Sequence, residues 1–482
     1  MTPPSPLALG VLVPVVAGLL AAAFGRRGAS VIGLLGAAGV LATALALAQR
    51  VLQGGVQRYA VSGWAAPLGI ELRADGLSAA MLLLNAVVGT AVSLYALLYW
   101  SHRGSAGGAR GWLEADSFWP LWLLLWGAMN ALYLSADLFN LYVTLELMTL
   151  AAVGLVILTG SAVSLAAGMR YLLMALTGSL FYLFGVALLY ARYGTLAMEA
   201  LPPLLVPGAA TWVALALMTV GLLVKAALWP FHVWLPPAHA SAAAPVSALL
   251  SALVVKAPFY LVLRLWFGVF PEHLPALAWQ VLGALGAVAI LWGSLRAIRQ
   301  TQLKRLIAYS TVAQLGYLFL GFPLGAPTAG LMHVLAHALA KAALFMVAGA
   351  LTLLRGGTTL AELAGAARQR PLSALALLLG IWTLLGLPPS AGYLSKELLL
   401  AAALASDQAW WGWVLRAGSL LAAVYLALAL RPLVGRRAGG GGRPTGRVPK
   451  RLELIPLGLA LLAALFGTLP YGALLRFFEV RG

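Results

Sequence analysis

Apolar runs of about 20 residues recur along nearly the whole chain, separated by short polar or basic connections. Each run is long enough to cross the roughly 30 Å hydrocarbon core of a bilayer as an α-helix. Because the runs are continuously apolar rather than alternating, they predict helices and not a β-barrel. We therefore predict an all-α, polytopic membrane protein with about 14 transmembrane helices, centred near residues 16, 40, 87, 127, 149, 180, 217, 256, 287, 313, 341, 387, 421 and 464.

Prolines interrupt two of these runs, the seventh at "LWPFHVWLPP" (228–237) and the twelfth at "LLGLPPSAGYLSKE" (384–397). A proline inside a helix removes a backbone hydrogen bond, and in lipid the freed groups need protein or water as partners. If the fourth to eighth and the ninth to thirteenth helices form two repeats of five, each break falls in the fourth helix of its repeat. Five is odd, so the repeats are inverted. Paired breaks in inverted repeats are typical of ion-translocation sites.

The connections are short, which predicts a single integral-membrane domain over residues 1–482. The inverted repeats are expected at roughly 118–268 and 274–433, with flanking helices in 1–100 and 453–476. The alternating stretch "GIELRA" within residues 51–76 predicts a small hairpin on the outer side of the membrane. Residues 431–452 predict a basic, glycine-rich loop on the inner side.

The composition agrees with this class, with 62% hydrophobic and 9% charged residues and a mean hydropathy of +0.95. The net charge of +18 follows the topology, because most Lys and Arg residues fall in alternate loops. Basic loops mark the cytoplasmic side. We therefore expect a multi-pass protein of the cell (inner or plasma) membrane with both termini on the outer side and no nucleic-acid partner. The first run has no basic segment before it, which favours a first helix over a cleaved signal peptide.

The sequence predicts no resident cofactor and no metal site. It contains no cysteine, which excludes disulfides, thiolate metal sites and Cys-ligated iron–sulfur clusters. Its six histidines are scattered, and no phosphate-binding loop or dinucleotide fingerprint is present. No catalytic chemistry of its own is therefore expected, and whether the chain is part of an enzyme is left open.

A few ionisable residues lie inside the apolar runs. A charged side chain at mid-bilayer costs roughly 3 to more than 10 kcal/mol, so such groups must face one another or water. Lysine and histidine exchange protons readily, whereas arginine does not, and none of the central groups is arginine. These groups therefore predict a proton relay, made of Glu146, Lys225, Lys256, His333, His337, Lys341 and Lys396.

Spacing supports the relay in one helix, because His333, His337 and Lys341 follow one another at intervals of four residues. Residues spaced in this way lie on one face of an α-helix, so the three side chains predict a polar stripe roughly 12 Å long. Such a stripe offers successive positions for a proton.

Simpler interpretations exist for several charged residues. A pair of Glu146 with Lys225 that only fixes helix packing is the alternative to a relay. His232 and His239 lie in the first break and are interpreted as loop or cap residues, and the role of Glu397 is left open. Arg264 and Arg416 lie toward helix ends, where we interpret them as interfacial anchors.

Five segments together resemble the antiporter-like family shared by the D and A subunits of Mrp-type cation/proton antiporters, the proton-pumping membrane subunits of respiratory complex I and the corresponding subunits of membrane-bound hydrogenases. The match covers roughly residues 75–430. The segments are "LYVTLELMTL", "LLVKAALWPFHVWLPPAHASAAAPVSALLSALVVK", "TQLKRLIAYSTVAQLGYLFLG", "HVLAHALAKAALFMVAGAL" and "GLPPSAGYLSKELLL".

The resemblance implies 14 helices with two inverted five-helix repeats and broken helices 7 and 12. It also implies a glutamate on helix 5 paired with a lysine on helix 7, here Glu146 and Lys225. A hydrated polar axis then continues through Lys256, the stripe on helix 11 and Lys396.

The implied function is that of a proton-translocating subunit of a multi-subunit membrane complex. The chain lacks the C-terminal extensions of the Mrp A-type subunit and of the distal complex I subunit, which favours the D-type subunit of an Mrp-type Na⁺/H⁺ antiporter. The alternative is a proton-pumping membrane subunit of a complex I-like NADH/quinone oxidoreductase or a membrane-bound hydrogenase. Expected partners are other membrane subunits, protons and the lipid bilayer. Passage of Na⁺ through this chain and the direction of proton flow are left open.

Overall fold

The computed structural model describes residues 5–64, 69–270, 274–435 and 449–469, with their side chains except at 26–27 and 104–112. The regular secondary structure of this part is helical apart from one two-stranded hairpin. Its α-helices are α1 (Pro6–Gly54), α2 (Gly76–Leu134), α3 (Leu138–Ile157), α4 (Ala162–Tyr193), α5 (Ala209–Lys225), α6 (Leu235–Ser241), α7 (Ala244–Leu249), α8 (Lys256–Arg264), α9 (Ala276–Ile298), α10 (Leu303–Leu320), α11 (Pro327–Arg355), α12 (Pro371–Leu385), α13 (Ala391–Ala405), α14 (Trp410–Val434) and α15 (Arg451–Leu465).

Local sequence signals set many of the helix ends. Asp137 caps α3, because its carboxylate accepts hydrogen bonds from backbone N–H groups that have no partner within the helix, including that of Asn140 at 2.8 Å. Ser390 caps α13 in the same way, with 3.2 Å to the backbone nitrogen of Tyr393. Gly356 ends α11 with a φ of 74°, a left-handed conformation that glycine adopts without strain.

Ten helical segments of the described residues are long and apolar enough to cross a membrane. They confirm a multi-pass membrane protein. Two of the ten lie within α1 and are joined at Gly25, whose φ of 52° interrupts the helix. Each expected centre lies in a helix except residue 387, which lies in the second predicted break.

Both proline-rich breaks are present. Helix α5 ends at Lys225, and a 3₁₀ turn, η3 (Phe231–Trp234), leads into the short α6. Helix α12 ends at Leu385, and α13 begins at Ala391. Each predicted break therefore leaves two half-helices that are joined by irregular backbone.

The helix that contains Lys256 is also irregular, which the sequence did not predict. Between α7 and α8 the backbone forms a π-helical turn, η4 (Leu250–Val254), where the N–H of Val255 lies 3.4 Å from the carbonyl oxygen of Leu250. A π turn carries one extra residue and is common at functional sites. Lys256 begins the regular helix that follows.

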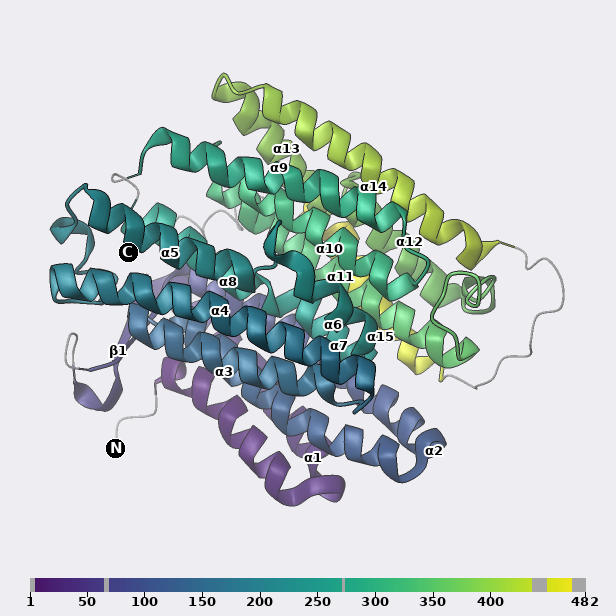
Figure 1. Ribbon diagram of the computed structural model, residues 1–482. Helices are drawn as coiled ribbons and strands as arrows, with labels where there is room; N and C mark the ends of the chain where they lie inside the picture. Colours follow the sequence, from purple (N-terminus) through teal and green to yellow (C-terminus); the bar gives the residue numbers. More distant parts are fainter. Residues whose placement is uncertain (1–4, 65–68, 271–273, 436–448, 470–482) are drawn as a thin grey trace.

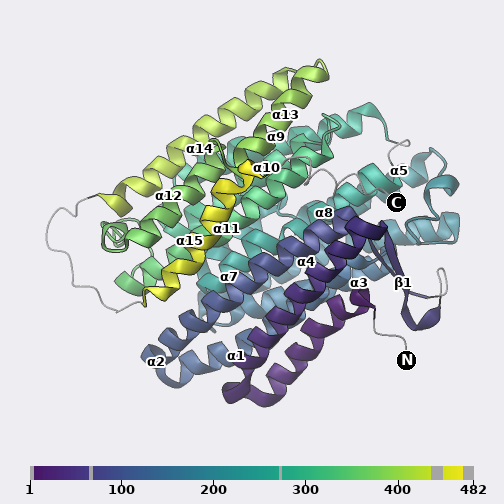
Figure 2. The ribbon, with the colours of Figure 1, turned by 180° about the vertical axis from the view of Figure 1, so that it is seen from behind.

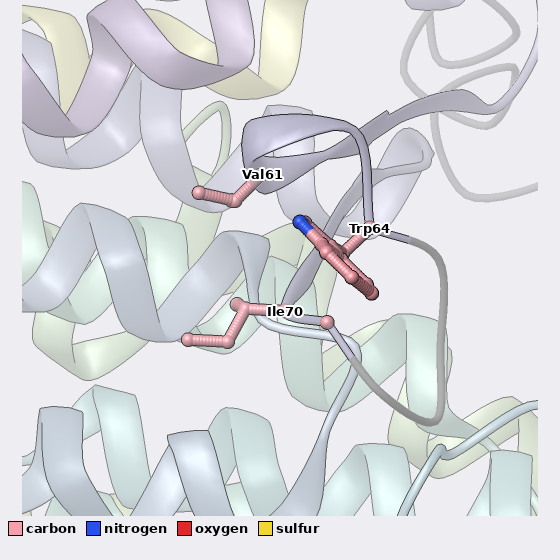
Figure 3. Close-up of a pocket in the computed structure, with 4 residues that line it drawn as sticks. Val61, Trp64 and Ile70 are labelled. Atoms are coloured by element: carbon pink, nitrogen blue, oxygen red, sulfur yellow. The ribbon is translucent and has the colours of Figure 1, made fainter.

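The predicted hairpin is confirmed. Strands β1 (Gln57–Ala60) and β2 (Glu71–Ala74) pair in antiparallel register, with Gln57 opposite Ala74. At the turn, Val61, Trp64, Gly69 and Ile70 line an open pocket, which Figure 3 shows. Its lining is apolar and carries no ionisable side chain, so this pocket does not extend the predicted relay.

Helices α7, α8 and α11 form the centre of the bundle. In Figures 1 and 2, α1–α4 lie on one side of them, and α9 and α12–α14 lie on the other. All of the apolar window in Ala244–Val269 and 94% of that in Pro327–Arg355 are buried, against 33% of that in Trp410–Val434. The helices that carry Lys256 and the His333–Lys341 stripe are therefore the most deeply buried.

Several predictions fall outside the described residues. These are the glycine-rich part of the inner loop (436–447), the end of the last flanking helix (470–476) and both chain termini.

Candidate functional site

Glu146 and Lys225 form an ion pair between α3 and α5. The lysine Nζ donates to Glu146 Oε1 at 3.1 Å and to the Thr149 hydroxyl at 2.8 Å. The hydroxyl of Ser179 on α4 also donates to Glu146. Lys225 is buried, whereas the Glu146 side chain is 18% exposed, so the carboxylate lies at the rim of the bundle.

The first break explains how Lys225 reaches this position. Lys225 is the last residue of α5, and the chain leaves the helix directly after it. The indole of Trp234, from the far side of the break, donates to the carbonyl oxygen of Val224 at 3.0 Å and stacks on Tyr171 of α4. A carbonyl group near the break therefore has a partner, and the lysine ammonium is left for Glu146.

Lys256 is completely buried on α8. Its Nζ donates to the carbonyl oxygen of Ser251 within the π turn. The hydroxyl of Ser251 lies 2.9 Å from that of Thr311 on α10. The π turn thus supplies a backbone acceptor to the lysine and a hydroxyl bridge to the neighbouring helix.

Lys341 on α11 approaches α10 from the other side. Its Nζ donates to the carbonyl oxygen of Ile307 at 3.0 Å and to the hydroxyl of Ser310. The hydroxyls of Ser310 and Thr311 donate to the same carbonyl oxygen of Ile307, at 2.8 and 3.0 Å, so the contacts of Lys341 and the Ser251–Thr311 contact meet at this group. Sequence reasoning missed both residues, although a Ser–Thr pair in the middle of a membrane helix was a signal for them.

His333 and His337 are buried on the same face of α11 as Lys341, with ring centroids 6.3 Å apart. Nδ1 of His333 lies 3.0 Å from the hydroxyl of Ser395 on α13. Neither ring nitrogen of His337 has a hydrogen-bond partner among the described residues. Buried polar atoms are nearly always bonded to protein or ordered water, so we expect internal water at His337.

Lys396 follows Ser395 and lies next to the second break. Its Nζ donates to the carbonyl oxygens of Leu384 and Leu385 at 3.1 and 2.9 Å, and to the hydroxyl of Ser419 at 3.0 Å. It also lies 4.9 Å from the ring centre of Tyr317. The lysine therefore binds the free end of α12 and is connected through its neighbour to the histidine stripe.

His239 belongs with this group, and its interpretation as a loop or cap residue was wrong. It lies inside α6, is fully buried and stacks on Phe345 of α11 at 4.5 Å. Both of its ring nitrogens lack hydrogen-bond partners among the described residues. The positive charges of Lys304, Lys341 and Lys256 all act on this ring.

His232 lies in the break itself, in η3. Its ring centroid is 6.4 Å from that of Tyr309 on α10, and the charge of Arg296 acts on it. The ring is thus adjacent to the group, and its Nδ1 has no hydrogen-bond partner within the part of the chain that the structure describes.

The centre of the site is basic. Helices α6, α8, α10 and α11 contain no Asp or Glu, so Glu146 is the single carboxylate among the predicted relay residues. The charge of Lys341 acts on Lys256, and both act on His337. In a region of low dielectric constant, a positive charge on one of these groups disfavours a positive charge on the next.

Six of the seven predicted residues fall into three hydrogen-bonded clusters within the described part of the chain, and His337 belongs to none of them. Glu146 and Lys225 form the first, Lys256 and Lys341 share the second through α10, and His333 and Lys396 lie in the third through adjacent residues of α13. No hydrogen bond joins the first cluster to Lys256 in the described residues. None of these side chains belongs to a group of three or more His, Asp or Glu that would hold a metal ion, as far as the structure describes the chain.

Comparisons with known proteins agree with this architecture. The chain is 39% identical to the N subunit of the NADH-quinone oxidoreductase of Desulforudis audaxviator, over 81% of this chain and 78% of that one. It is 30% identical to the D subunit of the Na⁺/H⁺ antiporter of Alkalihalophilus pseudofirmus, over 88% and 84%. A chain of the membrane-bound sulfane sulfur reductase, an archaeal respiratory membrane complex, superposes with a TM-score of 0.88 at 26% identity, covering 98% of this chain and 96% of that one. The family model described as NADH:quinone oxidoreductase/Mrp antiporter, TM, matches residues 135–422, and the chain belongs to that family.

Proposed function

We propose that the chain moves protons across the membrane as an antiporter-like component of a multi-subunit complex. The proton carriers are Glu146, Lys225, Lys256, His333, His337, Lys341 and Lys396. The observation that carries the proposal is the retention of four lysines in an apolar interior where one carboxylate is available to them. Such groups are expensive in a membrane unless they serve transport.

Charge repulsion provides the driving step within the chain. A proton that arrives at Lys256 makes protonation of Lys341 less favourable, and the reverse holds equally. Hydroxyl groups lie near both amines: Ser310 accepts from Lys341, and Ser251, whose carbonyl oxygen binds Lys256, contacts the hydroxyl of Thr311. With water joining these hydroxyls to Lys256 and to one another, a proton passes along the middle cluster without two lysines being charged together.

The gaps between clusters require water. His337 and His239 present buried ring nitrogens without partners among the described residues, beside Lys256 and Lys341. Water bonded to these nitrogens joins the middle cluster to His333 and, through α13, to Lys396. We include His239 in the proposed path on this ground.

The proposed architecture has 14 transmembrane helices with inverted repeats at roughly 118–268 and 274–433. The two breaks, each beside a lysine that carries protons, support this assignment. We place the chain in the cell membrane with both termini on the outer side, following the distribution of basic residues.

Partner subunits are part of the proposal. The partly exposed carboxylate of Glu146 lies beside Leu147 and Leu150, which are exposed along α3. A carboxylate facing lipid is unfavourable, so this face is expected to adjoin another membrane protein of the complex. An Mrp-type Na⁺/H⁺ antiporter, with this chain as its D-type subunit, is the first candidate complex.

A complex I-like NADH/quinone oxidoreductase is the second candidate. Matches to N subunits, 39% identical over 81% of this chain and 31% identical over 96% of it, favour the second candidate, while the match to a D subunit, 30% identical over 88%, favours the first. Identification of the co-purifying subunits distinguishes them: small antiporter subunits indicate the first, and quinone-reducing or iron–sulfur subunits the second.

The test uses the intact complex reconstituted into proteoliposomes with a pH-sensitive dye. We expect Lys225→Gln to lower proton transport by about 100-fold or more. The amide can still donate a hydrogen bond to Glu146, but it cannot take up or release a proton. Arg416→Gln, on the exposed face of α14, is the matched control and keeps normal transport. An assembled Lys225→Gln complex with wild-type transport would contradict the proposal.

A further inference from the structure

A network of charged residues extends inward from the hairpin end of the bundle, the end that carries β1 and β2 (Figure 1). Arg58 and Arg73 on the two strands bind Glu199 at 2.7 and 2.8 Å. Arg73 also lies 3.7 Å from Asp75, which is 3% exposed and caps α2. The Arg58 side chain is 52% exposed, so the network begins in solvent.

Asp75 is held by Arg264 of α8, whose two terminal nitrogens bind its two carboxylate oxygens. Arg264 was interpreted as an interfacial anchor, and the structure places its side chain in a largely buried ion pair. Burial alone would raise the pKa of Asp75. The Arg264 charge and hydrogen bonds, together with the N–H of Ser78 and the charge of Arg73, instead hold that pKa below its usual 3.8.

The inner end of the network is the hydroxyl of Tyr260. It accepts from Arg264 Nε at 2.9 Å, lies 3.2 Å from the Ser78 hydroxyl and donates to the carbonyl oxygen of Tyr133 at 2.9 Å. Arg264 also donates to Ser78 at 2.8 Å. Hydroxyl groups therefore separate the ion pair from the interior of the bundle.

Tyr260 and Arg264 share a helix face with Lys256. The three residues are spaced four apart on α8, and residues at that spacing are neighbours along a helix. About one helical turn, roughly 6 Å, separates Lys256 from Tyr260. The network thus ends one turn from a proposed proton carrier.

A packing role alone does not account for this set. The cap of α2 needs Asp75 but not Arg264, and a buried ion pair is commonly no more stabilising than apolar side chains of the same size. A series of ionisable and hydroxyl groups that leads from solvent to within one helical turn of Lys256 is, however, what a proton outlet requires.

We propose that the hairpin-end network is a gated route for protons between Lys256 and the hairpin side of the membrane. One proton leaves the Lys256 ammonium, which becomes an amine, and one arrives on the Asp75 carboxylate, which becomes a carboxylic acid. The hydroxyls of Tyr260 and Ser78 each accept one proton and release one, with water across the single turn from Lys256. Arg264 is the gate, because Asp75 keeps its negative charge while the guanidinium is bound to it.

The positive charge of Lys256 drives the opening. Arg264, Arg73 and the phenol of Tyr260 are the groups that face Asp75 from α8 and β2. A proton on Lys256 repels Arg264 two turns away on the same helix and loosens its hold on Asp75. When the proton leaves Asp75 toward Glu199 and solvent, Arg264 binds the carboxylate again.

This inference rests on the proposed function, and its test separates the two. Tyr260→Phe removes the hydroxyl alone, and Tyr182→Phe is its control, since Tyr182 is equally buried and also donates to a backbone carbonyl, that of Leu138. Asp75→Asn keeps an acceptor for the cap of α2 but removes the proton site. Each intact complex is reconstituted, and transport is measured while pH is varied on the hairpin side only.

We expect Tyr260→Phe to lower transport by about tenfold or more, and Asp75→Asn also to abolish the dependence on hairpin-side pH. Tyr182→Phe keeps both the rate and the pH profile. If Tyr260→Phe transports like Tyr182→Phe while Lys225→Gln is inactive, the outlet is wrong and the relay stands. If Lys225→Gln is also active, the relay itself is wrong. If the Asp75→Asn complex does not assemble, the transport rate of the Tyr260→Phe complex tests the outlet by itself.

Discussion

Lys225 and Lys396 lie beside the two helix breaks, but different groups hold them. Lys225 binds a carboxylate, Glu146, and a hydroxyl, Thr149. Lys396 binds two carbonyl oxygens at the end of α12 and the hydroxyl of Ser419. At the first break, the indole of Trp234 donates to a carbonyl oxygen near the end of α5, as Lys396 does at the end of α12.

The difference determines what each lysine charge is coupled to. A carboxylate can itself take a proton, so the charges of Lys225 and Glu146 rise and fall together. Carbonyl oxygens cannot, and a cation at the C-terminal end of a helix is favoured by the helix dipole. Lys225 therefore binds a partner whose charge can change with protonation, whereas the partners of Lys396 do not change their charge.

The largest effect on stability is expected for Lys225→Ala. It leaves the Glu146 carboxylate without its cation, which costs about 3–5 kcal/mol in the free energy of unfolding of the complex. The double variant Glu146→Ala/Lys225→Ala removes both charges and should recover part of that loss. Denaturation of the purified complexes measures both, and a double variant no more stable than the single one would show that the pair is not coupled.

Lys396→Ala should be less destabilising, by about 2 kcal/mol, because two helix-end carbonyl oxygens lose their donor. Lys396→Arg keeps a cation for those oxygens and is expected to keep stability while losing proton transport, since arginine does not release its proton. Denaturation and dye-based transport of the same preparations provide the two measurements. A Lys396→Arg complex that transports normally would remove Lys396 from the path.

Trp234→Phe tests the corresponding contact at the first break. The ring stack on Tyr171 remains possible, but the hydrogen bond to Val224 is lost, so we expect a loss of about 1 kcal/mol. Transport should persist, because the indole carries no proton in the proposed path. A loss of transport with unchanged stability would assign Trp234 a different role.

The smallest effect is expected for Ser419→Ala, which removes one of the three acceptors around Lys396. The two carbonyl oxygens remain, so the unfolding free energy should fall by about 0.5–1 kcal/mol. The corresponding Thr149→Ala removes the hydroxyl beside Lys225, and comparable losses would show that the hydroxyls act alike at the two breaks.

Much of the fold was accessible from sequence because its signals are local. Apolar runs predict membrane helices, and prolines in 228–237 and 384–397 predict breaks whatever surrounds them. The alternation in "GIELRA" likewise predicts β2. The π turn before Lys256 has no comparable signal, since its surroundings, such as the Ser251–Thr311 hydroxyl contact and the packing on α11, come from residues distant in the sequence.

The residues of the site also divide into those with a local sequence signal and those whose contacts only the fold reveals. Ionisable residues within apolar runs stand out individually, which is why Lys256 and His337 were found. Arg264 and Arg416 carry the same local signal near helix ends, yet Arg264 binds Asp75 and Arg416 is exposed beside Trp413. The partner of Arg264 lies 189 positions away in the sequence, so only the fold distinguishes the two.

The π turn at Leu250–Val254 also sets the rotational phase of everything after it on that helix. This turn takes up one extra residue, and in an α-helix each residue contributes about 100° of rotation. Conversion of the turn to regular α-helix, with all its residues kept, would therefore turn Lys256, Tyr260 and Arg264 together by about that angle. Such a conversion would withdraw the central amine and the hairpin-end gate from their neighbours without any change in the sequence.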